Sequence, residues 1–189
     1  MPKQLTLTIF LLLAAFMQVT HAEAVNYAGL SIGVSAADED CDYWGYNCDG
    51  NETAVKVFAG RRMHLNLALE IAYHDLGRLS DKSTSATSIA DSEGINLSIH
   101  GIIPVMENMA IYGKIGTMAW DTRYTRIGTS TVSSTDQGTD FTFGAGFYMQ
   151  WDDKYQLRFE FERLNELGNE FVPGGSDITL WSLGGAIHF

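Results

Sequence analysis

The sequence predicts an all-β protein, an eight-stranded antiparallel up-and-down transmembrane β-barrel. Apolar and polar residues alternate with period two in segments of about ten residues, the length that a tilted membrane-spanning strand needs. Short connections between these segments alternate with long polar ones, and helical periodicity is nearly absent. An even number of strands, short turns at one rim and long loops at the other are typical of outer-membrane barrels.

The first 24 residues are expected to be a secretory signal peptide that is removed. Lys3 precedes an unbroken apolar run over residues 9–17, and Ala22 and Ala24 then form an A-x-A cleavage pattern. The apolar run is too short to cross a bilayer as a helix. We therefore expect an exported chain with a single barrel domain over residues 25–189.

The strands are justified in order by their alternation. The first places Leu30, Ile32 and Val34 on one face, with glycine and serine on the other; the second alternates only loosely. The expected strands cover residues 26–36, 53–62, 67–77, 93–103, 109–120, 139–151, 155–164 and 176–189.

Three short connections lie at one rim, which is taken to be periplasmic. The four long connections cover residues 37–52, 78–92, 121–138 and 165–175 and are expected to be extracellular loops. The third of them is rich in Ser, Thr and Gly and predicts a flexible segment.

A soluble β-sandwich would bury the same apolar faces in a core. Two features favour the barrel. The second face is rich in glycine and charge, and aromatic residues lie near the strand ends, as interfacial girdles require. These aromatic residues are Trp151, Tyr155 and Phe189 toward the short-turn rim and Tyr73, Phe141 and Trp181 toward the long-loop rim.

The net charge of −11 argues against a nucleic-acid partner. Loss of the signal peptide removes one positive and one negative residue and leaves this charge unchanged. The expected partners are outer-membrane lipids and lipopolysaccharide, and an extracellular ligand at the loops. The chain is expected to be a monomer.

Several motifs resemble the OmpA-like transmembrane domain, a family of small eight-stranded barrels related to the OmpX type. They are "YAGLSIGVSAADED", "VKVFAGRRMHLNLALEIAYHDLG", "IYGKIGTMAWDTRY" and "LRFEFERL", and the resemblance covers nearly all of residues 27–189. It implies a Gram-negative outer-membrane location with both mature termini in the periplasm. Longer family members continue into a peptidoglycan-binding domain; this sequence stops at Phe189, so we do not expect wall anchoring.

The last strand is expected to pair with the first, because unpaired backbone groups in hydrocarbon cost several kcal/mol each. Its alternating residues also resemble the family's C-terminal signal for the outer-membrane assembly machinery. That signal would comprise Trp181, Leu183, Ile187 and Phe189.

Four charged residues are expected inside the barrel at similar depth, counted from the short-turn rim: Glu70, Lys114, Arg158 and Glu160. Because isolated charges in a confined lumen are costly, we expect them to form ion pairs. The resemblance implies a comparable internal network at matching positions. Since side chains fill an eight-stranded barrel, a structural plug is favoured over a gate, and an open pore is disfavoured.

No catalytic residue, metal site or cofactor is expected. Ser98 and His100 share the inward face of the fourth strand, but two residues along a strand separate them by about 7 Å, which is too far for a direct Ser–His bond without help. His64, His74 and His188 lack a second ligand at a fixed spacing.

The first long loop carries six acidic residues and the two cysteines, Cys41 and Cys48. We expect these cysteines to pair as a disulfide in an oxidising compartment. The expected function is structural support of the membrane with surface interaction or adhesion through the loops. A narrow gated channel is the alternative, and a lipid-modifying barrel enzyme is a more distant one.

Overall fold

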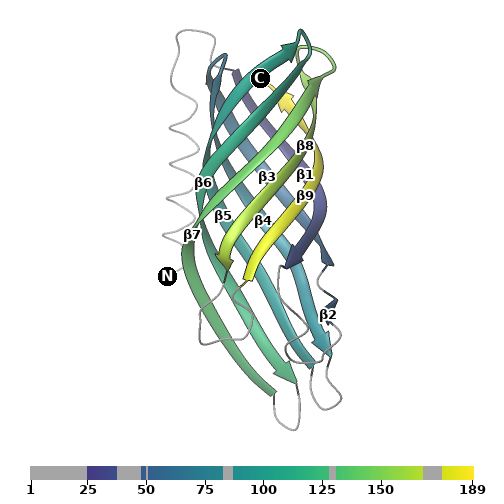
Figure 1. The fold of residues 1–189 in the computed structure, drawn as a ribbon, viewed down its shortest axis with the longest axis vertical. Helices are drawn as coiled ribbons and strands as arrows, with labels where there is room; N and C mark the ends of the chain where they lie inside the picture. The colour runs from purple at the N-terminus through teal and green to yellow at the C-terminus, as the bar shows by residue number, and fades with distance from the viewer. Residues whose placement is uncertain (1–24, 38–47, 50, 83–86, 128–130, 168–175) are drawn as a thin grey trace.

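Eight long strands form one antiparallel sheet that closes on itself in the computed structural model (Figure 1). The structure describes residues 25–37, 48–49, 51–82, 87–127, 131–167 and 176–189. The strands are β1 (Val25–Ala37), the two-residue β2 (Cys48–Asp49), β3 (Asn51–His64), β4 (Leu67–Lys82), β5 (Thr87–Met106), β6 (Met109–Ile127), β7 (Thr131–Gln150), β8 (Tyr155–Leu167) and β9 (Ser176–His188).

The sheet closes because its first and last strands pair. β1 runs antiparallel to β9 from Tyr27↔His188 to Ala37↔Ile178, and its other edge pairs with β3. Pairing between β4 and β5 completes the ring. Backbone groups along the seam are thereby satisfied without water, and the predicted eight-stranded barrel is confirmed. No helix within the described part of the chain is long and apolar enough to cross a membrane.

Side chains alternate between the lumen and the outside, as the period-two pattern predicts. Leu30 is 64% exposed, whereas the next residue, Ser31, is only 2% exposed. The outward apolar band includes Ile32, Val34, Ile71, Ile95, Leu97, Ile99, Ile111, Ile115, Phe143, Phe147, Leu157, Leu183 and Ile187. Exposed aromatic side chains also lie toward both ends of the band, at Tyr73 and Phe141 and at Trp151, Tyr155 and Phe189.

Tight turns join the strands at the rim that holds the C-terminus. Asn66 follows β3, and its Nδ2 donates to the carbonyl of Ile102 at 2.8 Å. Between β7 and β8, Asp152 Oδ1 accepts hydrogen bonds from the backbone N–H groups of Lys154 and Tyr155, at 2.7 and 2.9 Å. Such Asx turns hold a short connection in one conformation.

The strands are longer at the opposite rim than the sequence predicts. β4 continues to Lys82, β5 begins at Thr87, β6 continues to Ile127 and β7 begins at Thr131. The expected loops at 78–92 and 121–138 are therefore mostly paired strands over their described residues, and the flexibility of the third stays a prediction. These extensions are polar on both faces, so they lack the alternation that marks a strand with one buried side.

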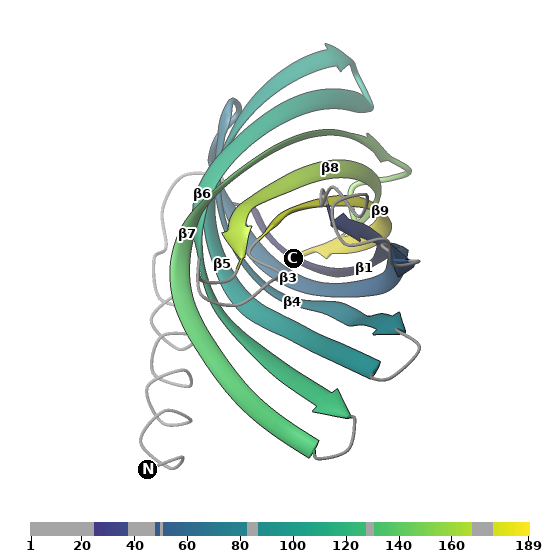
Figure 2. The same cartoon turned by 60° about the horizontal axis from the view of Figure 1, so that its bottom comes forward.

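The extended hairpins form a wall on one side of the barrel only. Figures 1 and 2 show β4 to β7 continuing well beyond the ends of β8 and β9. β6 and β7 pair along their whole length, from Ile127↔Thr131 to Met109↔Met149. β7 pairs with β8, however, only from Thr142↔Leu164 to Gln150↔Gln156.

A bulge bends β4 where it leaves the barrel. The register shifts between Asp75 and Arg78, and Gly77 adopts a φ of 81° that disfavours residues with a Cβ. A Cβ there would also lie 2.6 Å from the carbonyl oxygen of Thr53. Asp75 Oδ1 accepts the Gly77 N–H at 3.0 Å and stabilises this turn.

Leu97→Arg should destabilise the barrel by about 2–4 kcal/mol, because it places a charge on the lipid face near the middle of the apolar band. Ile127→Arg is the matched control, since Ile127 is exposed at the far end of β6 and should cost only about 0–1 kcal/mol. Urea unfolding of each variant in lipid bilayers measures the difference. Equal losses at the two positions would contradict the placement of the membrane.

Candidate functional site

Six charged side chains meet inside the lumen, each at most 3% exposed. They come from β3, β4, β6 and β8, and we call them the central charge cluster. Its members are the cations Lys56, Lys114 and Arg158 and the carboxylates Glu70, Glu160 and Glu162.

Arg158 connects two carboxylates on different strands. Its Nη1 lies 2.6 Å from Oε2 of Glu70 and its Nη2 lies 3.2 Å from Oε1 of the same residue. Its Nε lies 2.9 Å from Oε2 of Glu160, which Nη2 also contacts. The planar guanidinium suits this arrangement because it presents several N–H groups in a fixed fork.

Two lysines bridge the remaining pair of carboxylates. Lys114 Nζ lies 3.1 Å from Glu160 Oε1 and 2.6 Å from Glu162 Oε2. Lys56 Nζ also pairs with both Glu160 and Glu162. Each lysine therefore contacts two carboxylates, and each of these carboxylates contacts two lysines.

Four of these residues are expected from the sequence, whereas Lys56 and Glu162 were not among the predicted lumen charges. Both follow the same period-two rule. Lys56 is buried between the exposed Val55 and Val57, and Glu162 continues the inward face that Arg158 begins. Lys56 lies in the segment with the least regular alternation, and Glu162 lies farther from the rim used for counting depth.

The complete cluster contains three positive and three negative groups if all are ionised. A charge removed from water is costly unless a partner offsets it, so the two missed residues keep the lumen balanced. Tyrosine hydroxyls complete the bonding. Tyr27 donates to Glu70 at 3.1 Å, Tyr112 donates to Glu160 at 2.5 Å, and Arg158 Nε donates to the Tyr112 oxygen at 2.6 Å.

A buried apolar layer fills the lumen between the cluster and the extended rim. It consists of Ala54, Leu76, Met118, Trp120, Leu164, Ile178 and Leu180. The indole N–H of Trp120 donates to Asp140 at 2.5 Å, so its one polar atom is satisfied. Polar side chains surround these residues at the same level, since Asn96 and Asp140 pair in register with Met118 and Thr142 pairs with Leu164. The layer blocks the lumen by close packing of large buried side chains.

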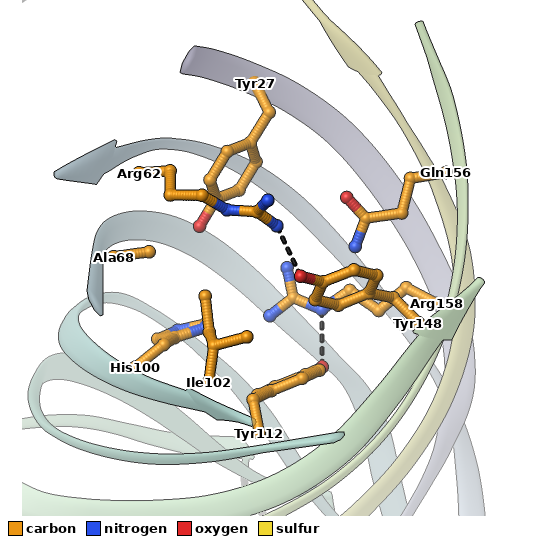
Figure 3. Close-up of a pocket in the computed structure, with 9 residues that line it drawn as sticks. All are labelled: Tyr27, Arg62, Ala68, His100, Ile102, Tyr112, Tyr148, Gln156 and Arg158. Atoms are coloured by element: carbon orange, nitrogen blue, oxygen red, sulfur yellow. Dashed lines mark hydrogen bonds between the residues drawn. The ribbon is translucent and has the colours of Figure 1, made fainter. Parts of the chain in front are cut away.

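A pocket opens on the other side of the cluster, toward the short-turn rim (Figure 3). Its lining includes Tyr27, Arg62, Tyr148 and Gln156, with Arg158 of the cluster at its inner end. The Arg62 guanidinium donates a hydrogen bond to the Tyr148 hydroxyl. Its central carbon, Cζ, lies 5.4 Å from the centre of the Tyr148 ring. The lumen is therefore asymmetric, with a polar pocket on one side and an apolar layer on the other.

The expected separation of Ser98 and His100 was wrong. Ser98 Oγ lies 3.1 Å from His100 Nε2, because the imidazole leans along the strand toward its neighbour. Glu70 Oε1 lies 3.8 Å from that same nitrogen. In a catalytic triad the acid contacts the other ring nitrogen from the one that faces the nucleophile, so this contact does not form a triad.

The C-terminal strand lies at the seam. Trp181, Leu183 and Ile187 are each about half exposed and point outward, and Phe189 is 70% exposed at the short-turn rim. Backbone hydrogen bonds join Phe189 and Asn26 in both directions, at 2.9 and 3.2 Å. Cys41 lies outside the described residues, as does nearly all of the first loop, and the side chain of Cys48 is not described.

Solved outer-membrane barrels share this fold. Ail, the attachment invasion locus protein of Yersinia pestis, superposes with a TM-score of 0.61 at 13% identity, covering 89% of this chain and all of Ail. Neisserial surface protein A gives a TM-score of 0.57 at 14% identity, over 89% of this chain and 98% of its own.

Sequence comparison also finds relatives and a matching family model. Outer membrane protein A of Salmonella typhi is 24% identical over 99% of this chain and 55% of its own length, and that of Shigella flexneri is 25% identical over 99% and 56%. The chain thus spans about half the length of the curated relatives it matches. Residues 21–189 match the family model for the OmpA-like transmembrane domain. The chain belongs to this family of outer-membrane β-barrels.

Proposed function

We propose that this barrel acts as a sealed structural element of the Gram-negative outer membrane, with its extended rim outside the cell and available for surface contact. The observation that carries the structural role is the balanced central charge cluster. Six buried charges link four strands across the lumen, and such a cluster fixes strand register while excluding water. In this proposal the mature termini lie in the periplasm, the chain acts as a monomer and residues 1–24 are the signal peptide.

Two barriers in series support a sealed lumen. An ion entering from the short-turn rim would reach the pocket and then meet Arg158, Glu70 and their partners. Beyond them lies the apolar layer, where Met118 and Leu180 are each 1% exposed. Rearranging ion pairs would open only the first barrier, since the second consists of packed apolar side chains that take no part in those ion pairs.

A gated channel remains the alternative function. The polar pocket beside the cluster favours it, because Arg158 lines the pocket and could exchange carboxylate partners. In that case the apolar layer would also have to move. Conductance separates the two functions.

Surface contact is supported by the likeness to Ail, which was also solved in complex with the heparin analogue sucrose octasulfate, at a TM-score of 0.62 and 14% identity. This chain carries a net charge of −11. A sulfated glycan is a poor electrostatic match for it, and a cationic partner is a better one. A Cys41–Cys48 disulfide would constrain the acidic first loop that contributes to this charge.

Wild-type protein and Lys114→Ala should both be silent in planar lipid bilayers, because the apolar layer still blocks the lumen when one charge is lost. Single-channel recording is the measurement. The double variant Met118→Ser/Leu180→Ser tests the second barrier with the cluster intact and should also be silent. Discrete conductance in the wild type that changes in Lys114→Ala would instead support the gated channel.

Lys56→Met should destabilise the barrel by about 3–5 kcal/mol, because it leaves the cluster with an unbalanced buried carboxylate. Adding Glu162→Gln restores the charge balance, so the double variant should be more stable than Lys56→Met alone. Urea unfolding in bilayers measures both, with Lys154→Met at the exposed turn as a control that should change little. Simple additivity of the two buried substitutions would contradict a coupled cluster.

A further inference from the structure

We propose that the open edge of β7 captures an extended, basic segment of another protein and adds it to the sheet as a further strand. The proposal deepens the surface contact proposed above and rests on it. It names the contact surface and the chemistry of the partner.

The edge consists of residues 131–141. In this stretch β7 pairs with β6 on one side, from Thr131↔Ile127 to Phe141↔Thr117, and with no strand on the other among the described residues. Its pairing with β8 begins only at Thr142. An unpaired strand presents N–H and C=O groups at every second residue, which is a template for strand addition.

Side chains do not protect this edge against another strand. Its sequence, "TVSSTDQGTDF", contains no lysine, arginine or proline, which are common protective residues, and its pairing with β6 shows no bulge. Residues 131–135 are all exposed, and exposure continues at alternate positions toward Phe141. Both faces near the tip are therefore accessible to an incoming strand.

The inward face of the edge is suited to a cation. Asp136 and Asp140 lie on this face, four residues apart, with Gly138 between them. The Asp136 Oδ2 atom is buried and has no hydrogen-bond partner among the described residues. The Trp120 indole lies against Gly138, where a Cβ would approach its Cζ2 to 2.4 Å. A lysine or arginine of an added strand would thus meet two carboxylates and an aromatic ring.

A second copy of this chain fits the edge less well. Two barrels in one membrane have the same orientation, so their β7 strands could meet only as parallel strands. The edge of a second β7 also contains no lysine or arginine, so it would offer Asp136 and Asp140 no cation. The charge pattern therefore favours a different, basic chain.

The test uses a fluorescent (Thr-Lys)4 peptide and the mature protein in zwitterionic nanodiscs without lipopolysaccharide. Fluorescence anisotropy should show saturable binding, and hydrogen exchange should show protection of residues 131–141 when the peptide is present. The matched (Thr-Glu)4 peptide should not bind. A (Pro-Lys)4 peptide carries the same charge but favours polyproline II over a strand, so it should bind much more weakly.

Two double variants separate edge binding from general attraction to an acidic protein. Asp136→Asn/Asp140→Asn should weaken (Thr-Lys)4 binding by about two- to thirtyfold, the range expected for two cross-strand charge pairs. Asp75→Asn/Glu93→Gln removes the same charge from the outward faces of β4 and β5, neither of which pairs with β7 in the described part of the chain, and should change the affinity by less than about twofold, as expected away from the edge.

Equal weakening by the two double variants, or binding without protection of residues 131–141, would overturn the proposal. So would the absence of (Thr-Lys)4 binding to the wild type, including the case in which the chain's own residues 168–175 occupy the edge. Failure here leaves the sealed barrel untouched, because that function is judged by conductance and unfolding. Self-association through β7 would appear as protection of residues 131–141 that depends on protein concentration without peptide.

Discussion

Charge balance in a closed lumen is the constraint on which the rest of this barrel depends. Eight strands leave an interior that side chains fill, so any charged group placed there must find its partner on a facing strand. Arg158 reaches across to Glu70 on β4, while Lys56 and Lys114 approach the β8 carboxylates from β3 and β6. A shift of one residue in any of these strands would turn its charged side chain toward lipid, and the cluster therefore enforces the register.

Much of the fold could be predicted because successive residues of a barrel strand face lipid and lumen in turn, and the sequence alternates accordingly. Alternation located all eight strands and placed four members of the cluster in the lumen. It could not give distances between side chains. The contact between Ser98 and His100 depends on how the imidazole leans, which strand spacing does not encode. Lys56 and Glu162 were detectable because they lie at the inward positions of the alternation. The four expected charges already balance, so charge balance alone did not point to two more.

The extended rim was hidden from the sequence for a physical reason. In their extended parts both faces of β6 and β7 carry mostly polar residues, so the sequence shows no alternation of apolar and polar side chains there. What makes these residues strands is their mutual pairing, a long-range property. The same polar side chains allow the open edge of β7 to lie in water. Asp136 and Asp140 make that edge acidic. In the proposed function, stability resides in the lumen and recognition at the rim, with the apolar layer between them.

The central claim is that the six buried charges are ionised and shielded from water. ¹⁵N nuclear magnetic resonance of the lysine ammonium groups, with the protein in lipid bilayers at neutral pH, tests it directly. Lys56 and Lys114 should each give a charged NH₃⁺ signal whose protons exchange with water far more slowly than those of the exposed Lys154. Rapid exchange at Lys56 and Lys114, or a neutral amine at either position, would contradict a sealed and charge-balanced lumen.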